Sequence, residues 1–229
     1  MRRSFIMLVA VFCMVEAVLG VLLHTPDGLV GMHFSYLSVL FAFLFCFLFI
    51  GRYPAYIFTQ IALLFTVAAD TILVFQHSDY TTLAMCFFSV TQVAYAIRLH
   101  TVMPAGVRPY HLAARVLFSS LAIGAVLVVV GKAADALAVI SLFYFANLVL
   151  NAAFAFADFR KNPLLAIGLF LFVLCDIFVG FSMLGGYLSL PDTRFVRFLV
   201  SPPINMAWVF YLPSQAILGI SLLPYKKAA

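Results

Sequence analysis

The sequence predicts an all-α membrane protein with eight transmembrane helices. Hydrophobic residues make up 66% of the 229-residue chain, charged residues make up 9%, and the mean hydropathy is +1.17. A water-soluble fold could not cover its surface with so few polar groups. Backbone groups in hydrocarbon must find hydrogen-bond partners within their own segment, so the spans are expected to be helices. Polar residues, prolines and glycines divide the chain into eight apolar runs near the ~20 residues that cross a bilayer.

The eight runs form one transmembrane domain, with boundaries set by polar residues and proline. They cover residues 5–23, 31–50, 54–75, 80–97, 114–131, 134–157, 163–187 and 203–223. Pro54 and Pro163 suit the first turn of a helix, where no N–H partner is needed, and Asn162 can cap the second of these helices. Pro213 falls inside the eighth run, where its ring removes one backbone hydrogen bond and favours a kink.

Basic residues are distributed unevenly between the two sides of the membrane. Ten lie on the side of the termini: Arg2, Arg3, Arg52, Arg98, Arg108, Arg115, Arg160, Lys161, Lys226 and Lys227. Three lie on the other side: Lys132, Arg194 and Arg197. Positive residues favour the cytoplasmic side, so both termini are expected in the cytoplasm, and the cell membrane is the expected location. The net charge of +5 comes from cations that flank spans, which argues against a nucleic-acid partner.

A weak internal repeat relates the two halves of the chain. A shift of 106 residues places Asp70 on Asp176. The span after each aspartate carries an aromatic residue four positions before a glutamine, as Phe88 with Gln92 and as Tyr211 with Gln215. This pattern predicts two four-helix halves, residues 1–110 and 111–229, with the same orientation in the membrane. The alternative is two unrelated polar pairs.

Asp70 and Asp176 are the main candidate functional residues. Each lies inside an apolar run, and a carboxylate facing hydrocarbon costs at least ~2.5–3.5 kcal/mol. Acidic groups at such depth normally face a protein interior or a water-filled cavity, so we expect both aspartates in one site. The alternative is a structural role in which each carboxyl bonds to a neighbouring helix.

Other polar residues within the spans are candidates for the same site. They are Glu16, Gln92, Tyr95, Asn147, Tyr211 and Gln215, each of which could instead bond helices together or anchor at the membrane interface. The sequence has no HExxH or GxSxG pattern, so neither a catalytic zinc site nor a serine nucleophile is expected. We therefore expect no metal and no organic cofactor.

Four stretches in these runs resemble the YhhN family of eight-span membrane proteins, which is named for lysoplasmalogenase activity. They are ALLFTVAADTILVF, FFSVTQVAYAIRL, NPLLAIGLFLFVLCDIF and FYLPSQAILGIS, within residues 55–99 and 162–222. The family commonly has a histidine in span four where this chain has Gln92, and a Lys-Pro pair at span two that this chain lacks.

The resemblance implies that the protein hydrolyses the vinyl ether of a lysophospholipid, with Asp70 and Asp176 as catalytic acid and base and the other polar residues binding the lipid. Two carboxyl groups suit this reaction because one must deliver a proton while the other stays ionised. A transporter that relays protons or binds a cation through its intramembrane acids is one alternative. A non-catalytic lipid-binding protein is the other, and the departures from the family pattern favour it.

Overall fold

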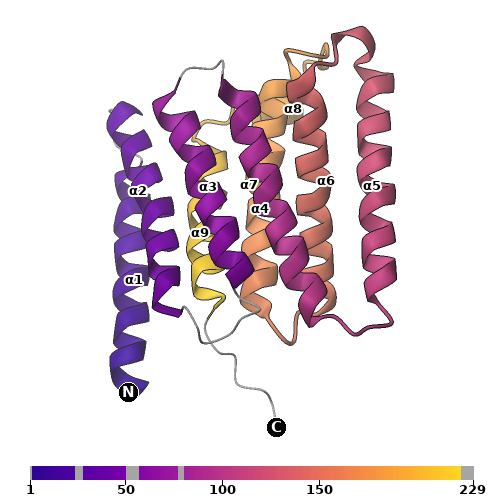
Figure 1. The fold of residues 1–229 in the computed structure, drawn as a ribbon. Coiled ribbons are helices and arrows are strands. Elements are labelled where there is room, and N and C mark those ends of the chain that lie inside the picture. Colours follow the sequence, from indigo (N-terminus) through magenta and orange to yellow (C-terminus); the bar gives the residue numbers. More distant parts are fainter. Residues whose placement is uncertain (1, 24–27, 50–56, 77–79, 223–229) are drawn as a thin grey trace.

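The computed structural model describes residues 2–23, 28–49, 57–76 and 80–222, and within them the chain is entirely helical (Figure 1). The α-helices are α1 (Arg2–Leu22), α2 (Gly28–Cys46), α3 (Ile57–Phe75), α4 (Thr81–Val102), α5 (Arg108–Val129), α6 (Ala136–Ala157), α7 (Pro163–Leu184), α8 (Arg194–Val200) and α9 (Met206–Ile220). Two short 3₁₀ helices, η1 (Phe47–Phe49) and η4 (Gly131–Ala133), follow α2 and α5. The all-α prediction is confirmed.

The apolar helices fit a membrane protein. Five of them, α3 to α7, are long and apolar enough to cross a bilayer by length and composition. Three shorter apolar segments, Ile6–Leu22, His33–Cys46 and Met206–Ile220, lie in α1, α2 and α9. These eight helices coincide with the eight expected runs, but the count of eight spans and the position of the termini stay predictions.

Some expectations concern residues outside the described part of the chain. They are Pro54, Arg52, Lys226 and Lys227, together with the side chains of Arg2 and Arg3. The start of α7 does lie among the described residues and agrees with the sequence. Pro163 is in its first turn, and Asn162 Oδ1 accepts a hydrogen bond of 3.1 Å from the Leu165 amide.

Two boundaries differ more than the others from the sequence prediction. The fifth helix begins at Arg108 rather than at residue 114, with Pro109 in its first turn, and the fourth extends to Val102 rather than ending at residue 97. The connection between them is therefore residues 103–107. The short helix α8 was not expected. It begins where the Thr193 side chain accepts a hydrogen bond of 3.2 Å from the Val196 amide.

Six helices form a closed ring around the core. Their order is α2, α3, α4, α6, α7 and α9, and α9 packs back against α2 (Figure 1). Helix α1 packs outside the ring against α2 and α9, and α5 packs outside it against α6. Apart from α8, successive helices alternate in direction, so α1 begins and α9 ends at the same end of the bundle, which we call the terminal end (Figure 1).

Glycines allow the ring to close tightly around α9. A Cβ atom at Gly219 would lie 3.1 Å from the Ala42 carbonyl oxygen of α2, which is closer than packed side chains normally come. On the other side of α9, the Ser214 hydroxyl donates a 2.8 Å hydrogen bond to the Gly168 carbonyl of α7. The backbones of α2, α9 and α7 therefore approach one another closely.

Corresponding helices of the two halves have corresponding neighbours. In the first half α1 packs on α2, α2 on α3 and α3 on α4; in the second, α5 packs on α6, α6 on α7 and α7 on α9. The ring is completed by α4 against α6 and by α9 against α2. This arrangement is compatible with two related halves, and the internal repeat stays a prediction.

Candidate active site

Asp70 lies on α3 inside the ring and is bound by a tyrosine from the other half of the chain. Its side chain is 3% exposed, and the Tyr211 hydroxyl of α9 donates a hydrogen bond of 2.7 Å to its Oδ2. The bond joins residues 141 positions apart in sequence. The contact between α3 and α9 therefore gives the buried carboxyl a hydrogen-bond donor.

Asp176 faces Asp70 from α7 and has a different environment. Its Oδ2 is buried without a hydrogen-bond partner, whereas the Tyr144 hydroxyl of α6 and the neighbouring Cys175 thiol lie within hydrogen-bonding reach of the carboxyl group. The two aspartates are close enough to interact electrostatically. The ring thus gathers two carboxyl groups and two tyrosine hydroxyls from α3, α6, α7 and α9.

Aromatic side chains surround the two tyrosines. The ring of Phe172 lies 5.3 Å from that of Tyr211, and the ring of Phe88 lies 5.5 Å from that of Tyr144, measured between centroids. Trp208 makes an edge contact with Tyr211 at 5.4 Å. Packed rings of this kind hold each hydroxyl in position and keep the local dielectric low, which strengthens the polar interactions inside.

The two glutamines of the sequence repeat are both fully buried. Gln215 lies one turn beyond Tyr211 on α9, and neither atom of its amide group has a hydrogen-bond partner. Gln92 lies one turn beyond Phe88 on α4; its Oε1 accepts a 3.0 Å bond from Asn151, and its Nε2 has no partner. Buried polar atoms are normally paired, so these amides are among the groups in the ring that are available to a polar ligand.

Asn147 belongs to a second polar cluster, which we call the Arg115 cluster and which consists of His111, Arg115, Asn147 and Asn151. Arg115 on α5 donates to Asn147 Oδ1 at 3.2 Å, to Asn151 Oδ1 at 2.6 Å and to His111 Nε2 at 2.9 Å. Asn151 connects this cluster to Gln92 through its bond to the amide oxygen.

Tyr95 and Glu16 lie elsewhere in the bundle. Tyr95 is fully buried on α4 with an unpartnered hydroxyl, one turn from Arg98, which binds Thr59 and the Ser221 hydroxyl. Glu16 lies on α1, outside the ring, and accepts a hydrogen bond from Ser38 of α2. Of the expected site residues, the structure therefore brings Asp70, Asp176 and Tyr211 together, and it connects Asn147 with Gln92 through the Arg115 cluster.

Sequence reasoning missed Tyr144, Arg98 and Arg115. Both arginines count as cations flanking a span, yet they are 1% and 8% exposed and bind polar groups of neighbouring helices. One signal was available for Arg115, because His111 lies four residues before it and so shares its helix face. Tyr144 sits in the middle of an apolar run, where a hydroxyl needs a partner, and that was the available signal.

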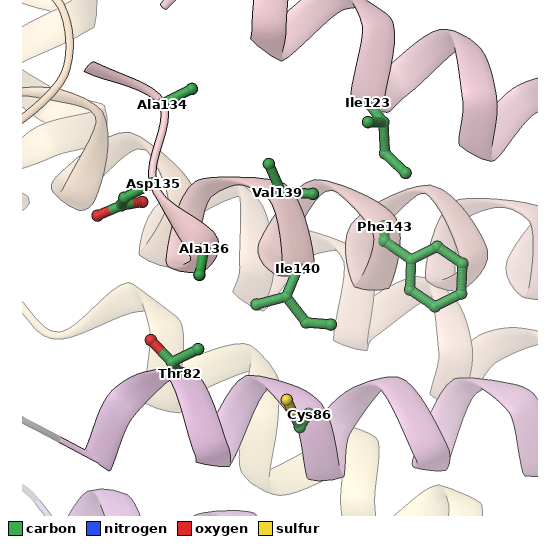
Figure 2. Close-up of a pocket in the computed structure, with 9 residues that line it drawn as sticks. All are labelled: Thr82, Cys86, Ile123, Ala134, Asp135, Ala136, Val139, Ile140 and Phe143. Atoms are coloured by element: carbon green, nitrogen blue, oxygen red, sulfur yellow. The ribbon is translucent and has the colours of Figure 1, made fainter. Parts of the chain in front are cut away.

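A cleft among the described residues lies away from the aspartates. It has a volume of about 650 Å³ and opens between α4 and α5 over the surface of α6 (Figure 2). Its lining is mainly apolar: Thr82, Cys86, Ile123, Ala134, Asp135, Ala136, Val139, Ile140 and Phe143. Phe143 faces this cleft, whereas the next residue, Tyr144, contacts Phe88 within the ring.

The family comparison covers most of the chain. The model of the YhhN family matches residues 30–218, which include the two aspartates, both glutamines and the Arg115 cluster. No curated protein and no solved structure matches the chain significantly. With more than three quarters of its length matched, this chain belongs to the YhhN family.

Proposed function

We propose that this YhhN protein is a lysoplasmalogenase-like intramembrane hydrolase that cleaves the vinyl ether of a lysophospholipid. The observation that carries the proposal is the pairing of two carboxyl groups in unlike environments within the ring. Asp70 accepts a hydrogen bond from Tyr211, whereas Asp176 has a buried oxygen without a partner. Pairs of acids whose environments differ are typical of sites where one carboxyl gives a proton and the other stays charged.

The two environments suggest which aspartate has which role. Both aspartates have a tyrosine hydroxyl within reach, but of the two it is Asp176 that has a buried oxygen without a partner, so Asp70 is assigned as the carboxylate that stabilises positive charge. Asp176 is assigned as the proton donor, because its Oδ2 is free to carry a proton toward a substrate. Tyr211 and Tyr144 are positioning residues for these two groups.

The reaction balances with water as the only co-reactant. Asp176 transfers its proton to the β-carbon of the vinyl ether, and the oxocarbenium ion that forms is stabilised by Asp70. Water adds to the cation and gives its proton to a carboxylate, which yields a hemiacetal. The hemiacetal then breaks its bond to the glycerol oxygen while its hydroxyl proton passes to that oxygen through the carboxyl groups, releasing a fatty aldehyde and the glycerophospho-headgroup. Gln92 and Gln215 have free amide donors that can hold the water or the glycerol oxygens.

The test is hydrolysis of lysoplasmalogen by the purified protein, followed by lipid mass spectrometry. Asp70→Asn and Asp176→Asn should each reduce turnover ~10²-fold or more, the size of a general acid or base contribution. The double variant should be little worse than the worse single variant, because groups that act as a unit are not additive. Tyr211→Phe should cost less, because it keeps both acids and removes one hydrogen bond.

Matched controls separate chemistry from folding. The saturated alkyl-ether analogue should not be cleaved, since it has no double bond that can accept a proton at the β-carbon. Glu16→Gln should retain activity, because Glu16 is a buried acid outside the ring. Full activity in either aspartate variant would remove that residue from the mechanism. An inactive but folded wild type that still binds lysolipid would support a non-catalytic lipid-binding protein, and proton-coupled uptake into vesicles would support a transporter.

A further inference from the structure

The α5–α6 seam is amphipathic along its length. On each helix a stripe of residues spaced four apart faces the other helix, which is the spacing of one helix face. The stripe on α5 is His111, Arg115, Ser119 and Ile123, and the stripe on α6 is Val139, Phe143, Asn147 and Asn151. The half nearer the terminal end is polar and buried, and the other half is apolar and opens into the cleft of Figure 2.

The polar half contains a buried cation whose described partners are all neutral. Arg115 is 8% exposed and donates to two asparagine oxygens and a histidine nitrogen. The ion pairs found among the described residues, Lys161 with Asp158 and Arg197 with Asp192, do not include it. A guanidinium group cannot become neutral by losing its proton in a protein, so its buried charge favours an anion beside it.

His111 occupies the part of the guanidinium where an anion would bind. Arg115 Nε and Nη2 donate to the same atom, His111 Nε2, at 3.1 and 2.9 Å. Two parallel N–H groups on one edge are the geometry with which arginine binds phosphate or carboxylate oxygens. Arginine can only donate, so His111 Nε2 accepts here and the imidazole is a neutral, replaceable partner.

The apolar half of the seam offers room for a hydrocarbon chain. The cleft is an open groove of about 650 Å³ with a mainly apolar lining. Ile123 and Phe143 line it, and each is one turn from a residue of the polar half, Ser119 and Asn147 respectively. Helix α5 is also the least buried of the five long apolar helices, so the gap between α4 and α5 is open at its side.

We propose that the α5–α6 seam is a binding site for a single-chain phospholipid, with the phosphate on Arg115 in place of His111 and the chain in the cleft between α4 and α5. The site lies outside the ring and is distinct from the aspartate pair. The choice of a lysophospholipid as the ligand rests on the proposed function, while the need for an anion next to an apolar chain rests on the seam itself.

The experiment is a binding titration in uncharged maltoside micelles with an alkyl-ether lysophospholipid, which the vinyl-ether chemistry does not consume. The monoalkylglycerol with the same chain is the matched ligand without phosphate. The wild type should bind the phospholipid ~10-fold or more tightly than the monoalkylglycerol, the effect expected of a charge-assisted hydrogen bond. Arg115→Gln should abolish that preference, and Arg115→Lys should keep part of it because the charge remains.

Two control variants test the position of the site. Arg108→Gln removes an exposed cation from the same helix and should keep the full preference. Ile123→Trp fills the cleft and should weaken both ligands, whereas Val128→Trp, at a position 84% exposed on α5, should weaken neither. Circular dichroism and gel filtration establish that each variant is folded; should Arg115→Gln not fold, Arg115→Lys and Ile123→Trp carry the test.

The proposal is overturned if folded Arg115→Gln retains the full preference for phosphate, or if Ile123→Trp binds both ligands as the wild type does. It is also overturned if Asp70→Asn abolishes binding, because the lipid would then occupy the ring. If Asp70→Asn still binds the phospholipid, this supports a binding site at the α5–α6 seam. None of these results depends on hydrolysis. The proposed lipid site can therefore hold when the proposed reaction is wrong, and the proposed reaction can hold when the lipid site is wrong.

Discussion

The two helices outside the ring are attached in different ways. At one corner α1 packs against both α2 and α9, and the buried acid Glu16 of α1 binds Ser38 of α2. At the other corner α5 packs against α6, and the buried base Arg115 binds two asparagines, while a cleft separates α5 from α4. We call these the closed corner and the open corner.

The difference indicates what each corner is suited to do. A carboxyl group can take up a proton and so exist in a low-dielectric environment without a counter-ion, but a guanidinium keeps its charge. The closed corner therefore needs no counter-ion, although Glu16 Oε1 is buried there without a hydrogen-bond partner. The open corner combines a permanent charge with an unfilled apolar surface, which is the combination that a charged amphiphile satisfies.

The largest expected effect comes from removing the two buried ionisable groups. Arg115→Ala leaves three buried acceptors unpaired, at ~1–3 kcal/mol each, so unfolding in detergent should require at least ~3 kcal/mol less free energy. Glu16→Ala leaves one hydroxyl unpaired and should cost about 1 kcal/mol. Equilibrium unfolding of both variants measures the contrast, and equal losses would mean that the two corners are held alike.

A second contrast uses glycines of the two corners. Gly219→Ala places a Cβ atom 3.1 Å from the Ala42 carbonyl in the closed corner, and overpacking of this kind costs about 1–3 kcal/mol. Gly124→Ala on α5 meets nothing within 4 Å and should stabilise its helix by ~0.5–1 kcal/mol. Melting temperatures that move in opposite directions are expected. A shift of the same sign in both variants would contradict the distinction between tight and open packing.

The smallest effect concerns the rim of the cleft, where Asp135 caps α6. Hydrogen bonds from the Ala138 amide and from the Tyr187 hydroxyl hold the pKa of this exposed carboxyl below its ordinary value. A lowered pKa means that the charged form adds stability above the ordinary pKa, and this contribution is lost as pH falls through the folded-state value. Asp135→Asn keeps the cap oxygen and loses the charge.

Acid titration of the melting temperature tests that assignment. Near neutral pH the melting temperature of the wild type should be slightly higher than that of Asp135→Asn. This difference should disappear below the folded-state pKa of Asp135. A difference that grows toward acid pH would have the wrong sign for a carboxyl whose pKa is lowered by its partners. Tyr187→Phe should reduce the effect in part, since it removes the second of the two donors.

Sequence reasoning succeeded where a residue is anomalous in its own segment. Asp70 and Asp176 are costly in apolar runs, which made them candidates before any neighbour was known, and the structure brings the two residues together. Asn162 and Pro163 likewise predicted the start of α7 from local chemistry. The all-helical class followed from composition, because a chain with this hydropathy has few other ways to satisfy its backbone.

What failed was the inference of partners. Arg115 lies near a span end, where a cation is ordinarily explained by membrane topology, and only the packing of α5 on α6 reveals its asparagine partners. The hydroxyl of Tyr144 in an apolar run calls for a partner, but only the placement of α6 beside α7 identifies that partner as Asp176. Hydropathy gives the depth of a residue along a helix but not the neighbour that its face meets.

The bond between Asp70 and Tyr211 has a consequence for biosynthesis. The helix that carries Asp70 leaves the ribosome long before α9, because 141 residues separate the two partners. During that interval the nascent bundle holds an acid without its native donor and a ring that lacks its last member. Translation of the final helix is therefore the step that completes the core, and a chain truncated before α9 should be handled by the cell as unfinished, however well its earlier helices have inserted.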